Sequence, residues 1–234
     1  MTSEAAPEST LPYPPLHTDK KFVVLSDWLK RRQGNLDILA GKVTFRDAFR
    51  EMLESISGNG HNFEFCKEEL KKNITLDGGF KDFHKYCKEQ DILGMEPSIR
   101  AVLSKLIGDD AKEIDIVSNN VDIHPDGTWS IKYRHPTSGF GHDKSQAILP
   151  YRRLPNPPLI FFFGDGVSDM SAARHADVLF VKCKDGGDND LAAYCRREGI
   201  PHILFADFSH ARVVVADIVE GRTTAAEALA KGKA

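Results

Sequence analysis

LIFFFGDGVSDMSAA, residues 159–173, opens on five apolar residues and turns polar at Gly164-Asp165-Gly166, with Asp169 four positions beyond the first aspartate. An apolar run of this length that ends in turn residues predicts a strand buried on both faces. The turn then places both aspartates at the carboxyl edge of a parallel sheet, where open α/β folds bind their ligands. Paired carboxylates on a tight turn suit a hard cation such as Mg2+. The plainer alternative is a polar turn in which Asp169 caps a helix, although a cap uses only one acid.

Other apolar runs are spaced as in an alternating α/β protein. Residues 21–27 predict a first buried strand with Asp27 at its carboxyl tip. Further strands are expected at residues 114–118, 177–181 and 201–205, and a β-hairpin at residues 119–133. Helices are expected at residues 80–90, 96–107, 145–151, 189–198 and 209–230. This alternation predicts an α/β fold with a Rossmann-like parallel sheet.

The chain also divides into regions of different character. Residues 1–19 are rich in proline, serine and threonine and predict a disordered tail. Residues 30–76 have helical spacing directly after the first strand and predict a small helical cap. Residues 20–29 and 77–234 are then the α/β core.

Composition excludes several classes of function. The chain has 234 residues and a net charge of −3, so no general attraction to nucleic acid is expected. No apolar stretch is long enough to cross a bilayer, so we expect no membrane partner. The start carries no secretory signal, and the four cysteines show no C-x-x-C spacing. These features predict a cytoplasmic protein with reduced thiols.

Three elements, taken in order, carry a family resemblance. Asp27 follows the first strand, Lys144 precedes a helix, and the run Gly164-Asp165-Gly166-Val167-Ser168-Asp169 follows a later strand. This set resembles the haloacid dehalogenase (HAD) superfamily, and within it the phosphoserine-phosphatase-like phosphatases. The helical segment after the first strand is similar to the small cap of that group. The resemblance covers most of residues 20–220.

The resemblance implies a phosphatase that acts on a small phosphorylated metabolite. Asp27 matches the aspartate that attacks phosphorus and forms an aspartyl-phosphate, which splits one hard step into two easier ones. Lys144 matches the lysine that stabilises the nucleophile and binds the phosphoryl oxygens of the substrate. Asp27 and Asp165 match ligands of Mg2+. Asp169 matches a residue that binds the metal directly or orients a water on it.

The first motif departs from the family pattern, which is Asp-x-Asp-Gly-Thr. Here the chain reads Asp27-Trp28-Leu29-Lys30-Arg31, so Leu29 stands where the proton-transferring aspartate should be. General acid–base catalysis contributes about 10²–10⁴-fold, and we therefore expect hydrolysis to be impaired. The alternative is a catalytically dead pseudo-phosphatase that binds a phosphate ligand or a partner. A phosphorelay receiver also pairs acids with a lysine, but it lacks a cap and carries its acid pair at the first strand.

A second departure concerns the strand expected before the helix at 96–107. In the family this strand ends in a serine or threonine that binds the phosphoryl group, followed by glycine and a helix. The run Gly94-Met95-Glu96-Pro97 matches the helix start and makes Gly94 a substrate-binding candidate. Only Ile92-Leu93 is left for the strand, which is too short. Both departures resemble clean excisions, so we hypothesise that this chain is a shortened form or gene-model variant of a complete phosphatase. Transcripts that encode no extra segment at these two places would disprove this hypothesis.

Three polar residues offer weaker alternatives. Ser118 ends a strand and could supply the missing hydroxyl, but the helix that should follow such a motif precedes it. His135 and His142 flank a glycine-containing loop near Lys144. They could contact substrate or partly replace the lost acid, although neutral loop histidines are the commoner case.

Overall fold

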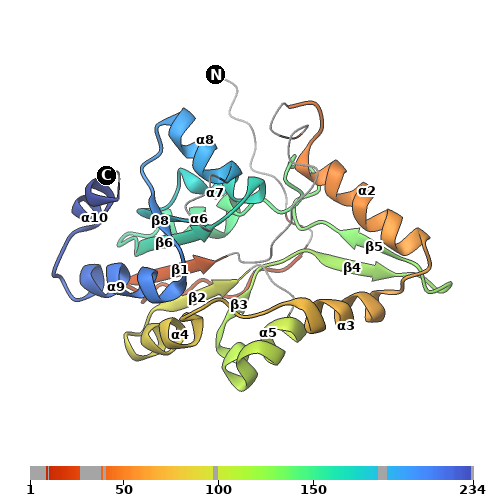
Figure 1. The fold of residues 1–234 in the computed structure, drawn as a ribbon, viewed down its shortest axis with the longest axis horizontal. Helices are drawn as coiled ribbons and strands as arrows, with labels where there is room; N and C mark the ends of the chain where they lie inside the picture. Colours follow the sequence, from red (N-terminus) through yellow and green to blue (C-terminus); the bar gives the residue numbers. More distant parts are fainter. Residues whose placement is uncertain are drawn as a thin grey trace.

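The centre of the molecule is a six-stranded, all-parallel sheet in the order β3-β2-β1-β6-β7-β8 (Figure 1). The computed structural model describes residues 9, 11–26, 38, 41–96, 100–183 and 189–232. The strands of this sheet are β1 (Phe22–Ser26), β2 (Leu93–Glu96), β3 (Asp115–Ile116), β6 (Leu159–Gly164), β7 (Val178–Lys182) and β8 (Ile203–Phe205). The predicted α/β fold with a parallel sheet is confirmed.

Strands β1 and β6 lie side by side, with Ser26 opposite Phe163. From β1 the chain adds β2 and β3 on one side and then crosses to β6 on the other. The order of the strands therefore reverses between β1 and β6, which is where open α/β sheets bind ligands. The turn after β6 and the carboxyl end of β1 at Ser26 lie together at this point.

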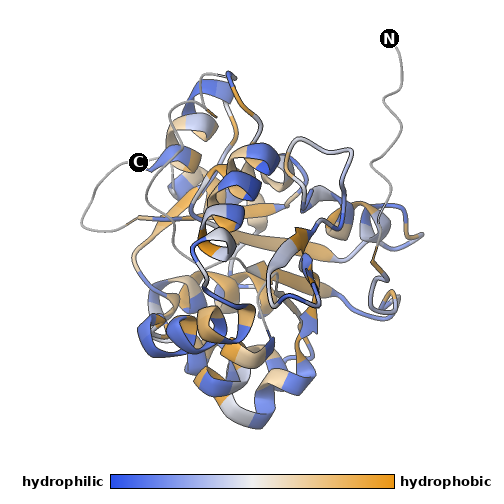
Figure 2. Cartoon of the chain, turned by 90° about the vertical axis from the view of Figure 1, so that its right-hand side faces the viewer, coloured by the Kyte–Doolittle hydropathy of each residue, from blue (hydrophilic) through white to orange (hydrophobic). Residues whose placement is uncertain are grey.

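Helices cover both faces of the sheet. They are α4 (Phe80–Glu89), α5 (Arg100–Ile107), α6 (Ser145–Arg152), α7 (Met170–Ala173), α8 (Asp190–Glu198), α9 (Phe208–Val219) and α10 (Ala225–Lys231). Apolar residues gather on the sheet and on the helix faces turned toward it (Figure 2). Among the described ranges, no helix is long and apolar enough to cross a membrane.

An aromatic cluster packs one of these faces. The ring of Phe163 on β6 stacks on Phe180 of β7, with centroids 4.5 Å apart, and the two rings lie 4° from parallel. Phe83 of α4 and Phe208 of α9 contact the same Phe163 ring. The consecutive phenylalanines of β6 are therefore core residues, and this packing holds the strand that ends in the Gly164 turn.

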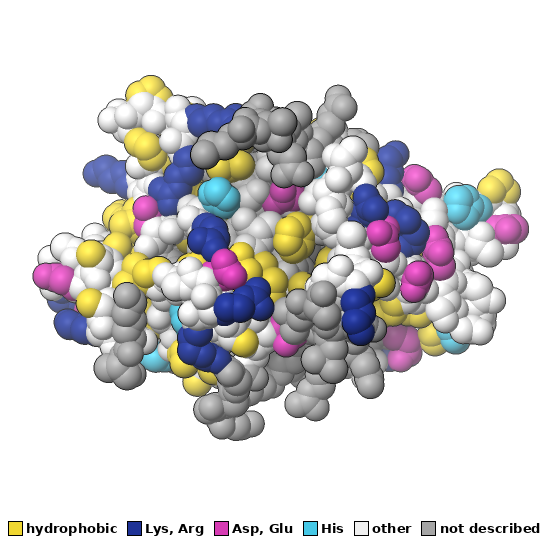
Figure 3. Space-filling model, turned by 90° about the horizontal axis from the view of Figure 1, so that it is seen from above, with side chains coloured by type: hydrophobic (Ala, Val, Ile, Leu, Met, Phe, Trp, Pro, Cys, Tyr) yellow, Lys and Arg dark blue, Asp and Glu magenta, His cyan; other side chains and the backbone are white. Residues whose placement is uncertain are grey.

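The cap contains α2 (Phe45–Gly58) and α3 (Phe63–Asn73), together with a hairpin of β4 (Asn120–Ile123) and β5 (Trp129–Lys132). The Trp129 amide donates to Ser57 Oγ at 2.9 Å, and its indole Nε1 donates to the His61 carbonyl at 2.9 Å. The hairpin, which the sequence predicts at residues 119–133, packs against α2 (Figure 1). Acidic and basic side chains lie next to one another over this part of the molecule (Figure 3).

The expectation of a missing central strand is wrong. Residues 93–96 form β2, with Val24 of β1 opposite Gly94. They do not begin the next helix, which starts only at Arg100. Without this strand, the backbone N–H and C=O groups on the facing edges of β1 and β3 would lack hydrogen-bond partners, and buried backbone groups need partners. Residues 93–96 therefore form the strand that joins β1 to β3 in the sheet.

Two other expectations need correction. Residues 11–19 are not a free tail, because Arg134 Nη1 donates to the carbonyls of Leu11 at 3.1 Å and Pro12 at 3.0 Å. The single helix expected over residues 209–230 is divided into α9 and α10. Gly221 lies between them with φ of 74°, a left-handed conformation that favours glycine and ends the first helix.

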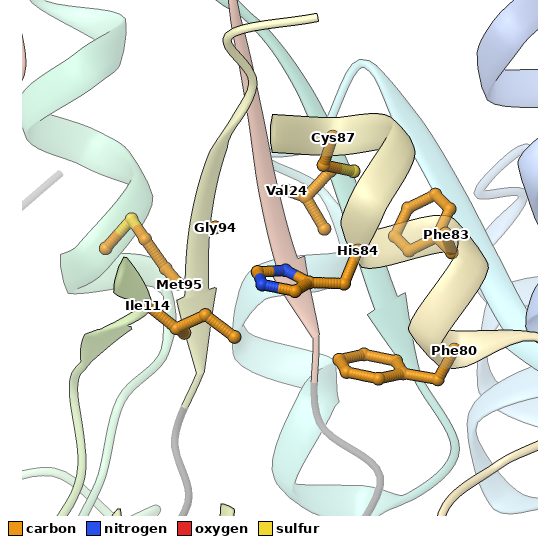
Figure 4. A pocket seen from close by; sticks show the side chains of 8 residues that line it. All are labelled: Val24, Phe80, Phe83, His84, Cys87, Gly94, Met95 and Ile114. Carbon is orange, nitrogen blue, oxygen red and sulfur yellow. The ribbon is translucent and has the colours of Figure 1, made fainter. Parts of the chain in front are cut away.

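A small cavity of about 20 Å³ lies where α4 faces Gly94 (Figure 4). His84 lines it, and its Nε2 atom is buried with no hydrogen-bond partner among the described residues.

We predict that Gly94→Ala raises the free energy of unfolding by about 0.5–1 kcal/mol, since glycine weakens a strand interior. The new methyl group would meet only Ile114 Cγ1, at 3.7 Å. Urea titration tests this, and an unchanged or lower value would contradict it.

Candidate active site

The turn after β6 is organised around the carboxylate of Asp169. Asp169 Oδ2 accepts hydrogen bonds from the backbone amides of Asp165 at 2.9 Å and Gly166 at 3.0 Å. The Asp169 side chain is fully buried. A Cβ on Gly164 would lie 2.6 Å from Asp169 Cγ, so only glycine fits there. Among the described residues no atom lies within 4 Å of where a Cβ on Gly166 would stand, so their packing requires glycine at Gly164 and not at Gly166.

Lys144 is the second charged component of this turn. It stands immediately before α6, and its ammonium donates to Asp169 Oδ1 at 2.5 Å and to Ser168 Oγ at 3.0 Å. The Lys144 side chain is 4% exposed. Two opposite charges buried together require close geometry and further hydrogen bonds, and both are present here. The structure thus brings Lys144, Asp165 and Asp169 together at this turn, and their roles in a site stay a prediction.

The other two predicted site residues are placed differently. Asp27 lies outside the described residues, but β1 ends at Ser26, the residue before it. Gly94 lies inside β2 and not at the start of a helix, and its role in substrate binding stays a prediction. The carboxyl end of this strand carries Glu96, where the family has a hydroxyl residue.

The residues present fit a hard cation in part. Asp165 is a partly exposed carboxylate at the switch point, and carboxylate oxygens are ligands that Mg2+ prefers. Both Asp169 oxygens already hold hydrogen bonds, which suits a residue that positions Lys144 and the turn better than a direct ligand. Within the described ranges no group of three or more His, Cys, Asp or Glu residues could hold a metal. Asp27 would have to complete the site with Asp165.

Neither of the two loop histidines is suited to replace the missing general acid. Both ring nitrogens of His135 have partners, Tyr13 Oη at 2.6 Å and the Asp143 amide at 3.0 Å. Burial lowers the pKa of His135 to about 4, so its ring is neutral at neutral pH. His142 stacks on it, with ring centroids 5.9 Å apart. Burial and the nearby charge of Lys144 lower the pKa of His142 as well, which opposes a role as proton donor.

Sequence reasoning missed two contributors. Ser168 accepts a hydrogen bond from Lys144, and its position directly before Asp169 was the available signal. Tyr13, which lies in the segment that the composition predicts to be a disordered tail, contacts His135. A tyrosine in a proline-rich stretch gives no periodic signal, so nothing in the local sequence pointed to this contact.

Comparison with known proteins adds a second line of argument. Pdp3-interacting factor 1 of Schizosaccharomyces pombe is 44% identical over 184 residues, 75% of this chain and 77% of that protein. Polyol phosphate phosphatase PYP1 of Saccharomyces cerevisiae is 37% identical over 205 residues, 81% of this chain and 82% of that protein. The 2-hydroxy-3-keto-5-methylthiopentenyl-1-phosphate phosphatase of Bacillus pumilus is 23% identical over 199 residues, 80% and 78% of the two chains. No family model matches the chain.

Two of these three relatives are phosphatases by name, and the fold places a buried lysine–aspartate pair at the switch point of a parallel sheet. The chain is therefore of the α/β phosphatase class. It belongs to the haloacid dehalogenase superfamily of phosphoric monoester hydrolases.

Proposed function

We propose that this chain is a Mg2+-dependent phosphatase of small phosphomonoesters that works through an aspartyl-phosphate at Asp27. The observation that supports this most is the Lys144–Asp169 pair beneath the Gly164 turn. It fixes a buried cation beside the carboxyl end of β1, directly after which Asp27 follows. A carboxylate and a phosphate repel each other, and a fixed cation between them removes that obstacle.

The residues divide the reaction between them. An oxygen of Asp27 would bond to phosphorus while the bond to the leaving alkoxide breaks, and water would later cleave the acyl phosphate to release inorganic phosphate. Lys144 would hold the phosphoryl oxygens, and Asp169 would hold Lys144. Asp27 and Asp165 would hold Mg2+, which when bound neutralises charge between carboxylate and phosphate. Leu29 offers no proton, so the alkoxide must be protonated by solvent and hydrolysis is slow.

The substrate we propose is a small phosphorylated metabolite. A relative that is 37% identical over 81% of this chain is named a polyol phosphate phosphatase. Polyol phosphates are therefore the first class to test on this chain. The cap, formed by α2, α3 and the β4–β5 hairpin, is the part of the molecule that would select among them.

The central test uses p-nitrophenyl phosphate with Mg2+. We predict that Asp27→Asn abolishes turnover and that Asp165→Asn lowers it by about 10²-fold or more at limiting Mg2+, because each removes a carboxylate from the reacting centre. Asp109→Asn is the matched control, since the Asp109 side chain is 91% exposed and pairs only with Lys112 among the described residues. Release of p-nitrophenolate is the measurement. Equal turnover in all three variants would contradict the proposal.

A pseudo-phosphatase is the second candidate function, and the observation that favours it is Leu29 at the acid–base position. The same proteins distinguish the two. If the parent chain shows no turnover but binds inorganic phosphate in the presence of Mg2+, and Asp165→Asn weakens that binding, the pseudo-phosphatase is supported.

A further inference from the structure

The segment Leu11–Tyr13 lies against the loop that leads into Lys144. Arg134 anchors it: the guanidinium donates to the Leu11 and Pro12 carbonyls and lies 4.8 Å from the centroid of the Tyr13 ring. Arg134 is 4% exposed, and its Nε donates to the Ser118 carbonyl at 3.1 Å. Two hydrogen bonds and a cation–π contact thus hold Tyr13 in place, far in the sequence from the loop it contacts.

His135 connects Tyr13 to this loop. It is completely buried, and its Nδ1 accepts a hydrogen bond from the Asp143 amide at 3.0 Å. An acceptor nitrogen carries no proton, so the neutral ring has its hydrogen on Nε2. That hydrogen is donated to Tyr13 Oη, 2.6 Å away. The Asp143 amide therefore fixes the tautomer, and the tyrosine hydroxyl helps to hold the orientation of the ring.

Asp143 carries this constraint to the lysine. Its amide is held by His135, and its Oδ1 accepts from the Ser145 amide at 3.1 Å and from Ser145 Oγ at 2.6 Å. Lys144 stands between these two residues, so its backbone is fixed on both sides. From there its ammonium reaches Ser168 and Asp169.

We propose that Tyr13 is a positioning residue for Lys144, acting through His135 and Asp143. The inference rests on the proposed function, in which Lys144 holds the phosphoryl oxygens. The N-terminal segment is then part of the machinery of the site and not an appendage. The effect expected from losing the hydroxyl is a displaced ammonium, and small misplacements of such groups are costly.

The test is Tyr13→Phe, which keeps the ring on Arg134 and removes the hydroxyl with its hydrogen bonds to His135, Arg134 and Ser9. Tyr86→Phe is the matched control, because Tyr86 lies on α4, its Oη donates to Glu220 at 3.1 Å and its ring contacts Arg212. We expect Tyr13→Phe to lower kcat/KM for p-nitrophenyl phosphate about tenfold, mostly in kcat. If the parent chain does not turn over, its affinity for inorganic phosphate with Mg2+ should fall by a similar factor. Tyr86→Phe should change neither.

A readout independent of activity accompanies both variants. The Lys144 ammonium is buried and hydrogen-bonded, so its nitrogen resonance can be followed by NMR. It should shift in Tyr13→Phe and stay in place in Tyr86→Phe. In a His135→Gln background, Tyr13→Phe should have no further effect on the resonance or on kcat/KM, because the connection is already broken. An equal change of melting temperature in the two tyrosine variants would not by itself produce this pattern of NMR and kinetic effects.

The outcomes separate the two proposals. An unmoved Lys144 resonance in Tyr13→Phe, or an effect that persists undiminished in His135→Gln, overturns the positioning role. If Lys144→Met leaves turnover and phosphate binding unchanged, the proposed function fails instead. A Lys144→Met variant that is inactive beside a fully active Tyr13→Phe overturns only the inference about Tyr13.

Discussion

Replacing Lys144 with methionine is expected to lower turnover by about 10²–10³-fold and the free energy of unfolding by about 3–5 kcal/mol. The substitution removes the ammonium from Asp169, whose carboxylate is fully buried and also accepts hydrogen bonds from the Asp165 and Gly166 amides. A buried charge without its partner is far more costly than a lost surface pair. Urea titration gives the stability, and release of p-nitrophenolate gives the activity.

Two further variants isolate the cause. Lys144→Met combined with Asp169→Asn removes both charges and keeps an acceptor for the turn amides, so it should recover much of the stability but none of the activity. Lys112→Met breaks an exposed pair with Asp109 and should change stability by less than about 1 kcal/mol. If the double variant is as unstable as Lys144→Met alone, the stability loss does not come from an unpaired carboxylate.

Gly164→Ala is expected to damage both the stability of the chain and the candidate site. Its Cβ would lie 2.6 Å from Asp169 Cγ and 2.8 Å from Oδ2, so the buried carboxylate must move away from Lys144. Overpacking of this kind costs about 1–3 kcal/mol of unfolding free energy, and the displaced pair should also reduce phosphate affinity. Denaturant titration and calorimetry with inorganic phosphate measure the two effects.

Gly166→Ala provides the comparison two residues away. No atom of the described residues lies within 4 Å of the position its Cβ would take, so folding should be nearly unaffected. The pair of variants thus distinguishes a glycine required by packing from one that is not. Equal stability of the two alanine variants would show that the Asp169 carboxylate moves without cost.

Much of this fold was predictable because its signals are local. The apolar run ending at Gly164 and the acids after it gave the strand, the turn and the relation of Asp165 to Asp169. The position of Lys144 before a helix followed from order along the chain. That the ammonium contacts Asp169 was not predictable from spacing, because the two residues belong to different elements that only tertiary packing brings together.

The errors arose where tertiary demands override local preference. Met95 and Glu96 favour a helix start when followed by proline, yet the sheet requires them as a strand between β1 and β3. Tyr13 sits in a segment whose composition indicates disorder, yet Arg134 and His135 hold it. Such contacts join residues more than a hundred positions apart, which no periodic pattern records.

The cap has an architectural consequence. Its helices leave the core after β1, whereas its hairpin leaves after β3, and Trp129 fastens the hairpin to the helices. The described part of this region is therefore built from two separate stretches of sequence and not from a single insertion. In the proposed function these elements select the substrate, so two distant stretches of sequence would have to change together for the selectivity to change.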